Sequence, residues 1–264
     1  MFNSATLVEL IKMSLSQAQI DQFLTEGYTT VPHFFNEDEV AAMQIEVARW
    51  IDTGMFRDVS TNPEVRQNYQ LIPLYSRSPL FKALPFAPKV INAVGNLIGH
   101  PVIKILDQSF YKPPQSGMGT SWHTDNAYFK LQDPLRGTAM WIAIHDGDIA
   151  NGTLKVAPRA FNEDFPHTRD PASDHHIHTE LDEARAVHCE LEAGGVVFFC
   201  FGTPHATGNN LSNESRVGVG IHFVNRDYTS PLQEKHWEQT VISGERTGEN
   251  FADEVRATLV QADS

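Results

Sequence analysis

Cysteine is scarce in this sequence: its 264 residues include two, Cys189 and Cys200. Two thiols cannot build a disulfide framework, and neither stands in a metal-binding pair, so we expect a reduced, cytoplasmic protein. Basic residues are also in deficit, with 20 lysines and arginines against 33 acidic residues and a net charge of −13. Such a surface repels phosphate backbones and anionic lipids, which argues against nucleic-acid and membrane partners.

Long hydrophobic runs are missing too. No run approaches the length of a membrane span, and the first residues do not form a secretory signal. No repeat or linker divides the chain, so we predict one domain over residues 1–264, with 1–13 as a loose extension. The polar tail 225–264 has one weak helical stretch. It could cover the domain or form a homodimer, and the sequence leaves both open.

Helical signals gather in the first hundred residues. Ser16 is a candidate N-cap and Gly27 a candidate stop, and Asn36 with Glu39 has the spacing of a capping box. A third helix is predicted from Pro88 to Ile98, because Gly99 follows it directly.

Beyond residue 100 the periodicity becomes that of strands, and turn signals rich in Gly, Pro and Asn separate the apolar runs. Helices followed by many short strands indicate an α+β fold, with a jelly-roll (double-stranded β-helix) core and the N-terminal helices packed on one side. The predicted strands are Val102–Tyr111, Ala139–Asp146, Thr153–Ala157, Val187–Leu191, Val196–Phe201 and Arg216–Val224.

Residues 158–186, called the insert below, are polar and aperiodic, which is typical of a lid or a binding loop. Their histidine-rich run 174–178 could suggest a second metal. No cysteine or ordered carboxylate spacing accompanies it, which favours a solvated lid.

The segment Gly-Thr-Ser-Trp-His-Thr-Asp-Asn-Ala-Tyr contains His123 and Asp125, whose side chains point the same way if the chain is extended. They supply two members of a facial triad of two histidines and one carboxylate, the ligand set of non-haem Fe(II) oxygenases. His205, just past an apolar strand, is the candidate third member. A His–Asp pair alone is more often a structural hydrogen bond.

A second pattern strengthens that hypothesis. In the strand that starts at Arg216, one face carries Val217, Val219, Ile221 and Phe223, and the other carries Arg216, Gly218, Gly220 and His222. Glycines leave room and arginine binds carboxylates bidentately, so the second face is typical of a cavity wall. The alternative is a surface arginine at a strand start.

Over roughly residues 15–225 the chain resembles the phytanoyl-CoA dioxygenase family of Fe(II)/2-oxoglutarate oxygenases. The resemblance rests on segments in the same order: LSQAQIDQFLTEGY from Leu15, HTDNAYF from His123, WIAIHD from Trp141, NGTLKVAP from Asn151, GGVVFF from Gly194, then His205 and NLSNESR ending at Arg216.

The resemblance implies that His123, Asp125 and His205 hold Fe(II) and that Arg216 binds the distal carboxylate of 2-oxoglutarate. It assigns Thr207, Trp141 and Thr120 to the co-substrate pocket. Lys104 and Gln108 are two polar residues on one face of the apolar strand 102–111, which is consistent with side chains that face a cavity. Lys104 is assigned to the co-substrate, and Gln108, together with Asn126, to the substrate.

The implied reaction uses O₂ and 2-oxoglutarate, releases succinate and CO₂, and hydroxylates a substrate C–H bond. Asp125 argues against the related halogenases, which leave that position empty for chloride. After Pro158 the family continues with Gly-Ser-His, whereas this chain has Arg159-Ala160-Phe161, so the substrate does not transfer.

Cationic and imidazole groups in the insert favour a small polar substrate with an anionic group, such as a phosphonate, or one that is amino-acid-like, betaine-like or an acyl-CoA. Two other functions stay open: a metal-binding jelly-roll sensor without turnover, and a metal enzyme of another class such as a zinc hydrolase. Neither of these needs a carboxylate clamp opposite the triad.

Overall fold

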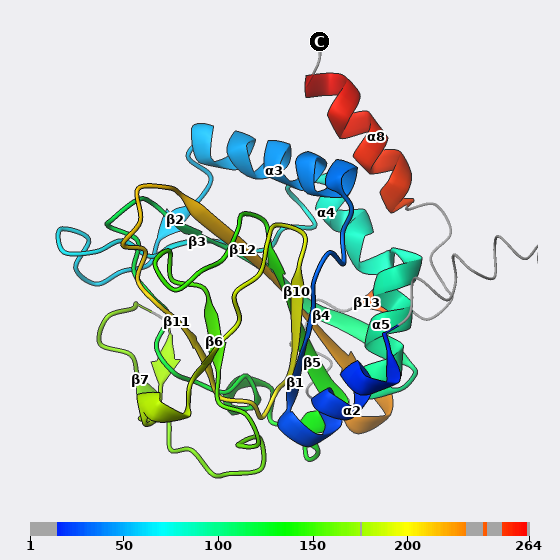
Figure 1. Cartoon of the computed structure of the whole chain (residues 1–264), viewed down its shortest axis with the longest axis vertical. Coiled ribbons are helices and arrows are strands. Elements are labelled where there is room, and N and C mark those ends of the chain that lie inside the picture. Colours follow the sequence, from blue (N-terminus) through cyan, green and yellow to red (C-terminus); the bar gives the residue numbers. More distant parts are fainter. Residues whose placement is uncertain (1–14, 175, 231–239, 242–249, 263–264) are drawn as a thin grey trace, which may run out of the picture.

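The computed structural model describes residues 15–174, 176–230, 240–241 and 250–262 (Figure 1). The extension predicted for residues 1–13 lies outside these described residues. Within the described part of the chain, no helix is long and apolar enough to cross a membrane.

An eight-stranded antiparallel sheet forms the centre of the molecule (Figure 1). Its path is β1-β10-β5-β12-β4-β3-β2, and β13 pairs with β4 at the side. The strands are β1 (Tyr28–Val31), β2 (Arg57–Asp58), β3 (Tyr69–Leu71), β4 (Val102–Lys112), β5 (Gly137–Ala143), β10 (Val196–Cys200), β12 (Arg216–Asn225) and β13 (Thr240–Val241).

A smaller sheet packs against one face of the large one. Its order is β11 (His205–Thr207), β6 (Leu154–Val156) and β9 (Val187–His188). Leu154 and Val156 share a buried cluster with Trp141 and Phe199 of the large sheet. Two antiparallel sheets closing over a common interior form a jelly-roll core, so the predicted α+β class is confirmed.

Helices cover the opposite face of the large sheet (Figure 1). The capping box expected at Asn36 is present, and the expected N-cap Ser16 also forms one, with Gln19. Gly27 ends the first helix with a left-handed φ of 82°. These helices are α2 (Gln17–Glu26), α3 (Glu37–Asp52), α4 (Pro79–Ala83), α5 (Pro88–Ile98) and α8 (Phe251–Ala262), whereas the short α6 (Asn126–Phe129) lies on the other side of the sheet.

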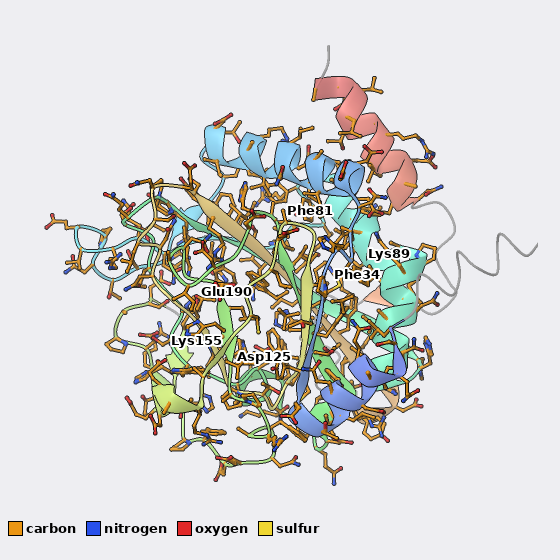
Figure 2. The ribbon with its side chains drawn as sticks, in the orientation of Figure 1. Phe34, Phe81, Lys89, Asp125, Lys155 and Glu190 are labelled. Atoms are coloured by element: carbon orange, nitrogen blue, oxygen red, sulfur yellow. The ribbon has the colours of Figure 1, made fainter. Side chains whose placement is uncertain are left out.

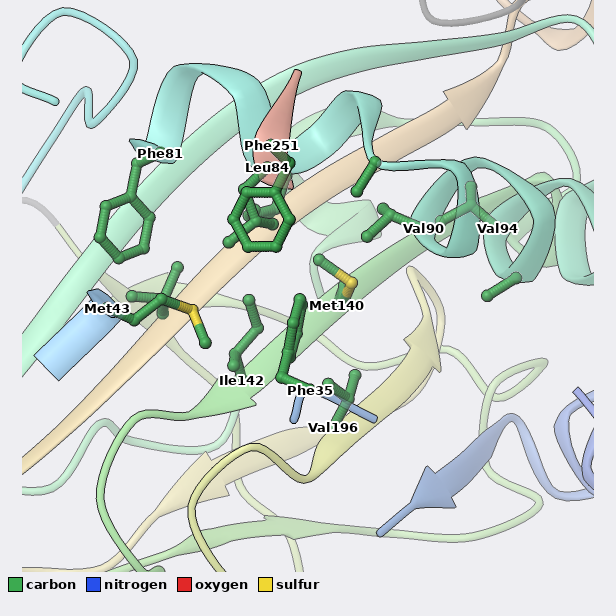
Figure 3. Packing of buried hydrophobic residues seen from close by; sticks show 14 of the residues in the cluster. Phe35, Met43, Phe81, Leu84, Val90, Val94, Met140, Ile142, Val196 and Phe251 are labelled. Carbon is green, nitrogen blue, oxygen red and sulfur yellow. The ribbon is translucent and has the colours of Figure 1, made fainter. Parts of the chain in front are cut away.

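The main hydrophobic core fills the layer between these helices and the sheet (Figure 3). Met140 and Ile142 of β5 point into it, whereas the intervening Trp141 points to the jelly-roll interior. In β12 the odd-numbered apolar residues enter the helical core, as the alternation predicted. The even-numbered face is therefore left for the interior, where the candidate site lies.

Several short elements were not predicted. Strand β3, helix α4 and strand β11 are too short to show a periodic pattern, and they are fixed by contacts with neighbouring elements. The insert, expected to lack regular structure, contains a small hairpin of β7 (Thr168–Arg169) and β8 (Ile177–His178). The weak helical stretch of the tail forms α8, which packs on α3 and α4.

Candidate active site

His123 and His205 lie opposite each other on neighbouring segments. Each donates its backbone N–H to the other's carbonyl oxygen, at 3.1 Å and 2.9 Å, in an antiparallel bridge. Asp125 has helical torsions (φ −61°, ψ −30°) and stands directly before α6. The carboxylate is therefore brought beside His123 by a turn, not by the continuous extended chain assumed from the sequence. Figure 2 marks Asp125 in the interior, away from the helical side that holds Lys89.

Both imidazoles have their tautomer fixed by the backbone. His123 Nδ1 lies 2.9 Å from the Ser121 carbonyl oxygen, and His205 Nδ1 lies 3.0 Å from that of Thr203. A carbonyl oxygen only accepts hydrogen bonds, so each Nδ1 carries the proton. In the neutral ring, Nε2 then carries the free lone pair, which is the tautomer that binds a metal ion through Nε2.

The three side chains converge on one point. Asp125 Oδ1 lies 3.9 Å from His123 Nε2 and 3.8 Å from His205 Nε2. One ligand atom from each residue falls within 4.8 Å of the others. This spacing and chemistry fit a single metal ion bound on one face, with positions left for other ligands.

The electrostatics of the three residues favour metal binding. Burial raises the pKa of Asp125, but the neighbouring imidazoles of His222, His205 and His123 outweigh it and hold that pKa well below its usual value. Burial and the adjacent His123 lower the pKa of His205 to about 3. The carboxylate is thus charged and His205 neutral near pH 7, as metal ligands must be.

A third imidazole completes this cluster. His222 of β12 is 4% exposed, and its Nε2 lies 3.2 Å from Asp125 Oδ2, the carboxylate oxygen turned away from the other two histidines. The sequence had placed His222 on the interior face of its strand without giving it a role. Its position suits an outer partner that orients the carboxylate.

Arg216 lines the same interior and is fully buried. Its Nη2 donates to the Gly152 carbonyl oxygen, but Nε and Nη1 have no hydrogen-bond partner in the described structure. A buried guanidinium with two unsatisfied donors is costly unless an anion completes it. Burial lowers its pKa to about 10, so it stays charged near neutral pH.

The surrounding wall is shaped by an aromatic ring and two glycines. The Trp141 ring lies beside Arg216, with 5.7 Å between the guanidinium carbon and the ring centroid. A Cβ at Gly218 would come within 2.7 Å of Trp141 Nε1, whereas one at Gly220 would meet nothing closer than 3.8 Å. Gly218 is therefore required by Trp141, and Gly220 leaves open space.

This contrast predicts different outcomes for two alanine substitutions on the same strand face. Gly218→Ala forces the Trp141 ring to move and is expected to destabilise the protein by about 1–3 kcal/mol. Gly220→Ala is expected to change stability by less than about 0.5 kcal/mol. Urea denaturation of the metal-free proteins measures both. Equal midpoints would contradict the packing described for Trp141.

The triad and Arg216 open into one cavity of about 590 Å³. Thr120, Trp141 and Thr207 line it together with the fully buried Arg216, and these four residues define what is called its inner end below. The outer part is mostly apolar, and its polar groups include an amide pair in which Gln70 Nε2 donates to Gln108 Oε1 at 2.8 Å. Two exposed arginines, Arg57 and Arg77, also line the cavity.

The insert is hydrogen-bonded to the segment that carries His123 and Asp125. Thr124 N–H donates to His167 Nε2 at 3.1 Å, and Thr179 N–H donates to the Trp122 carbonyl oxygen at 2.8 Å. Glu183 accepts from the Trp122 indole at 2.7 Å and from Lys155, which Figure 2 labels, at 2.5 Å. Of the insert, His176 and Ile177 line the cavity.

Lys104 does not reach the cavity, which corrects its assignment to the co-substrate. A β-bulge leaves Ile105 without a partner, so Leu106 pairs with His222 but Lys104 pairs with Phe223. Paired residues share a face, so the bulge turns Lys104 to the helical side. There its Nζ lies 2.5 Å from Asp107 Oδ2. Gln108, beyond the bulge, does face the cavity as predicted.

Asn126 is also absent from the cavity lining, against its assignment to the substrate. Its side chain accepts from Leu131 N–H at 2.8 Å and donates to the Leu131 carbonyl oxygen at 3.0 Å. Both amide groups are thus used to close the turn after α6. Two of the insert's three arginines form ion pairs elsewhere: Arg159 pairs with Glu26, and Arg185 pairs with Glu163. The third, Arg169, is exposed and does not line the cavity. Besides Arg216, the cations that line the cavity are Arg57 and Arg77.

The residues missed by sequence reasoning include Lys112, Gln70, Arg57 and Arg77. Lys112 stands before two prolines and was grouped with a turn, although it is the last residue of β4 and pairs with Arg216. Lys112 lies four residues after Gln108, so strict alternation along the strand would have placed both side chains on the same face. The other three come from short segments whose placement no periodicity indicates.

The donor set fits iron and a carboxylate-bearing co-substrate. The interior presents two imidazoles and a carboxylate on one side and a charged guanidinium with two unused nitrogen donors on the other. Zinc hydrolysis would use the first group but would leave the buried Arg216 unsatisfied. The class that this combination defines is that of the Fe(II)- and 2-oxoglutarate-dependent oxygenases.

Comparisons with known proteins lead to the same class. Residues 23–218 match the profile of the phytanoyl-CoA dioxygenase (PhyH) family. An ectoine dioxygenase of Bordetella parapertussis is 24% identical over 238 residues, covering 82% of this chain and 77% of the relative. A phytanoyl-CoA dioxygenase of Arabidopsis thaliana is 23% identical over 261 residues, covering 81% and 90%.

Solved structures share the fold. EctD from S. alaskensis, with 2-oxoglutarate and 5-hydroxyectoine, superposes with a TM-score of 0.68 at 18% identity, covering 89% of each chain. The carbocyclase SnoK from nogalamycin biosynthesis gives a TM-score of 0.67 at 20% identity, covering 80% of this chain and 84% of its own. The chain belongs to the phytanoyl-CoA dioxygenase family and is an Fe(II)- and 2-oxoglutarate-dependent dioxygenase.

Proposed function

We propose that this enzyme hydroxylates a C–H bond of a small polar substrate that carries an anionic group. His123, Asp125 and His205 hold the iron, and Arg216 with Thr207 receives the distal carboxylate of 2-oxoglutarate. The observation that carries the proposal is the buried Arg216, whose Nε and Nη1 lack partners on the wall of the cavity that holds the triad.

Bound iron, with 2-oxoglutarate and O₂, supplies the oxidising chemistry that breaks the C–H bond. The side chains of the protein position the reactants. The Ser121 and Thr203 carbonyls keep the Nε2 atoms of the triad histidines free to bind. Trp141 and Gly218 shape the wall beside the guanidinium, and the insert limits access of water to the interior.

The outer part of the cavity supports a substrate with an apolar body and a polar end. Met55, Leu106 and Phe110 offer apolar surface there, and the Gln70–Gln108 pair offers neutral hydrogen bonds. Arg57 contacts Asp174 of the insert, so part of its charge is already balanced. Arg77 is exposed and forms no ion pair among the described residues, which suits it to an anionic group of the substrate.

The binding part of this function is tested by anaerobic titration. Adding Fe(II) and then 2-oxoglutarate to the protein should produce the weak visible charge-transfer band of a chelated 2-oxo acid. The hydroxylase part is tested by succinate release above the uncoupled rate across phosphonates, amino acids, betaines and acyl-CoAs. A protein that binds Fe(II) without forming the band would not be this enzyme.

Arg77 gives a prediction for the substrate that stimulates turnover. Arg77→Gln is expected to raise its KM about two- to fivefold, the range for an exposed charge contact, and to leave uncoupled 2-oxoglutarate consumption unchanged. Arg256→Gln on α8 makes the same change of charge away from the cavity and serves as the control. Equal KM values for both variants would remove Arg77 from the substrate site.

A further inference from the structure

Lys112 is buried beside the candidate co-substrate site, and no acidic side chain pairs with it in the described part of the chain. Its Nζ donates to three oxygens: Thr207 Oγ1 at 2.8 Å, the Gly152 carbonyl at 3.2 Å and the Gly208 carbonyl. Burial and the nearby charge of Arg216 lower the pKa of Lys112, whereas two carbonyl oxygens, which can only accept, favour its protonated form. The ammonium form has three N–H bonds, so all of its donors are used. A fully satisfied cation of this kind holds its surroundings in one arrangement.

The backbone around Lys112 is built for this contact. Gly152 has a left-handed φ of 75°, and a Cβ there would come within 2.2 Å of the Gly208 carbonyl oxygen. Two glycines thus allow two loops to approach closely, which brings both carbonyls to one ammonium group. Lys112 therefore joins the end of β4 to the loop before β6 and to the end of β11.

The contact with Lys112 determines whether the Thr207 hydroxyl can donate or accept a hydrogen bond in the cavity. Thr207 Oγ1 accepts from Lys112 Nζ and also from the Thr120 backbone N–H, each at 2.8 Å. A hydroxyl oxygen has two lone pairs and one proton. With both lone pairs occupied, Thr207 can act only as a donor toward the cavity that it lines.

Arg216 presents the matching donors. It pairs in register with Lys112 across β12 and β4, and its Nη2 shares the Gly152 carbonyl with the ammonium group. The unused Nε and Nη1 protons of Arg216 and the Thr207 hydroxyl proton all belong to the inner end of the cavity. A surface that offers only hydrogen-bond donors suits a carboxylate, which only accepts. It disfavours an amide or a hydroxyl, because their own N–H or O–H groups would find no acceptor there.

We propose that Lys112 is a positioning residue of the co-substrate site, which locks Thr207 as a hydrogen-bond donor to the distal carboxylate of 2-oxoglutarate. This inference rests on the proposed function, because it takes Arg216 and Thr207 as the receivers of that carboxylate. Lys112 itself does not line the cavity, so it acts through Thr207.

The test compares Lys112→Met with a matched control in the same strand. Lys104→Met removes an equally buried lysine that points to the helical side. The dissociation constant of 2-oxoglutarate is measured anaerobically in the Fe(II)-loaded proteins from the charge-transfer band. Lys112→Met should raise it about tenfold, as loss of a supporting hydrogen bond does at other sites, with Fe(II) affinity kept. Lys104→Met should lower stability but leave this constant unchanged.

A double-mutant cycle with Thr207→Val separates positioning from a structural role. If Lys112 acts through Thr207, its replacement should weaken 2-oxoglutarate binding at least about threefold less in the Thr207→Val background. An equal effect in both backgrounds would overturn the proposal. So would unchanged 2-oxoglutarate binding in Lys112→Met and in Lys112→Gln, the second of which keeps donors for the carbonyls if the first does not fold.

Two different results would separate the proposed function from the role of Lys112. Absence of the charge-transfer band in the unmodified enzyme would overturn the proposed function itself. A normal band in the unmodified enzyme, with the same dissociation constant in the Lys112 variants, would overturn only the role of Lys112.

Discussion

Asp125→Ala is expected to abolish stoichiometric Fe(II) binding and, with it, all turnover. Asp125 is the one carboxylate of the described triad, and its charge is maintained by the surrounding imidazoles. Without it, the site would offer a divalent cation two neutral nitrogen ligands and no compensating charge. Iron content after anaerobic loading and desalting measures the loss, and His205→Ala should give the same result.

The control for this prediction is another buried aspartate. Asp107 is 1% exposed, pairs with Lys104 and accepts a hydrogen bond from Leu74 N–H on the helical side of the sheet. Asp107→Ala leaves a buried lysine unpaired and should cost about 3–5 kcal/mol of stability. Its folded fraction should still load iron fully. Full iron loading and activity in Asp125→Ala or His205→Ala would show that the triad is wrongly assigned.

Arg216→Gln is expected to raise the apparent KM for 2-oxoglutarate by roughly 10- to 100-fold. The charged, bidentate contact that it removes is worth on the order of 1.5–3 kcal/mol, and each 1.4 kcal/mol is tenfold. Arg216 does not contribute to the metal cluster, so the affinity for Fe(II) should change little.

Arg136→Gln is a suitable companion variant. That arginine is partly exposed and pairs with Asp133 outside the cavity, so its loss should not affect 2-oxoglutarate. The expectation for Arg216 would be contradicted by an unchanged KM, or by loss of Fe(II) binding in parallel with the loss of 2-oxoglutarate binding.

Alternation along long strands was the part of the fold that the sequence could predict well. In β12, eight residues of regular alternation, 216–223, placed Arg216 and two glycines on one face, and that face does line the interior. The same reasoning failed for Lys104, because one bulged residue reverses the face of everything beyond it. Nothing in the local composition around Ile105 marks the bulge, which is defined by pairing with a strand more than a hundred residues away.

Side chains in turns were harder still. Asn126 has the polarity of a ligand-binding residue, but its amide is used by the backbone of Leu131, and no periodic pattern predicts such a local bond. The triad histidines could be predicted because two histidines and one carboxylate form the ligand set of a particular class of metal site. Lys112 was missed because a lysine before two prolines is most often a solvated turn residue, and only the three-dimensional pairing buries it.

The residues from Trp122 to Asp125 have a different partner on each side. His123 and Asp125 turn toward the metal position, while the Trp122 carbonyl and the Thr124 N–H are hydrogen-bonded to the insert. Metal binding that orders residues 122–125 should therefore also order their contacts with the insert. By thermodynamic linkage, a ligand that orders the insert should strengthen metal binding by the same factor. Iron loading should protect the insert's amides from hydrogen exchange, and an anionic substrate held under the insert should slow the release of iron. Such an enzyme would retain its metal best while its cavity is filled.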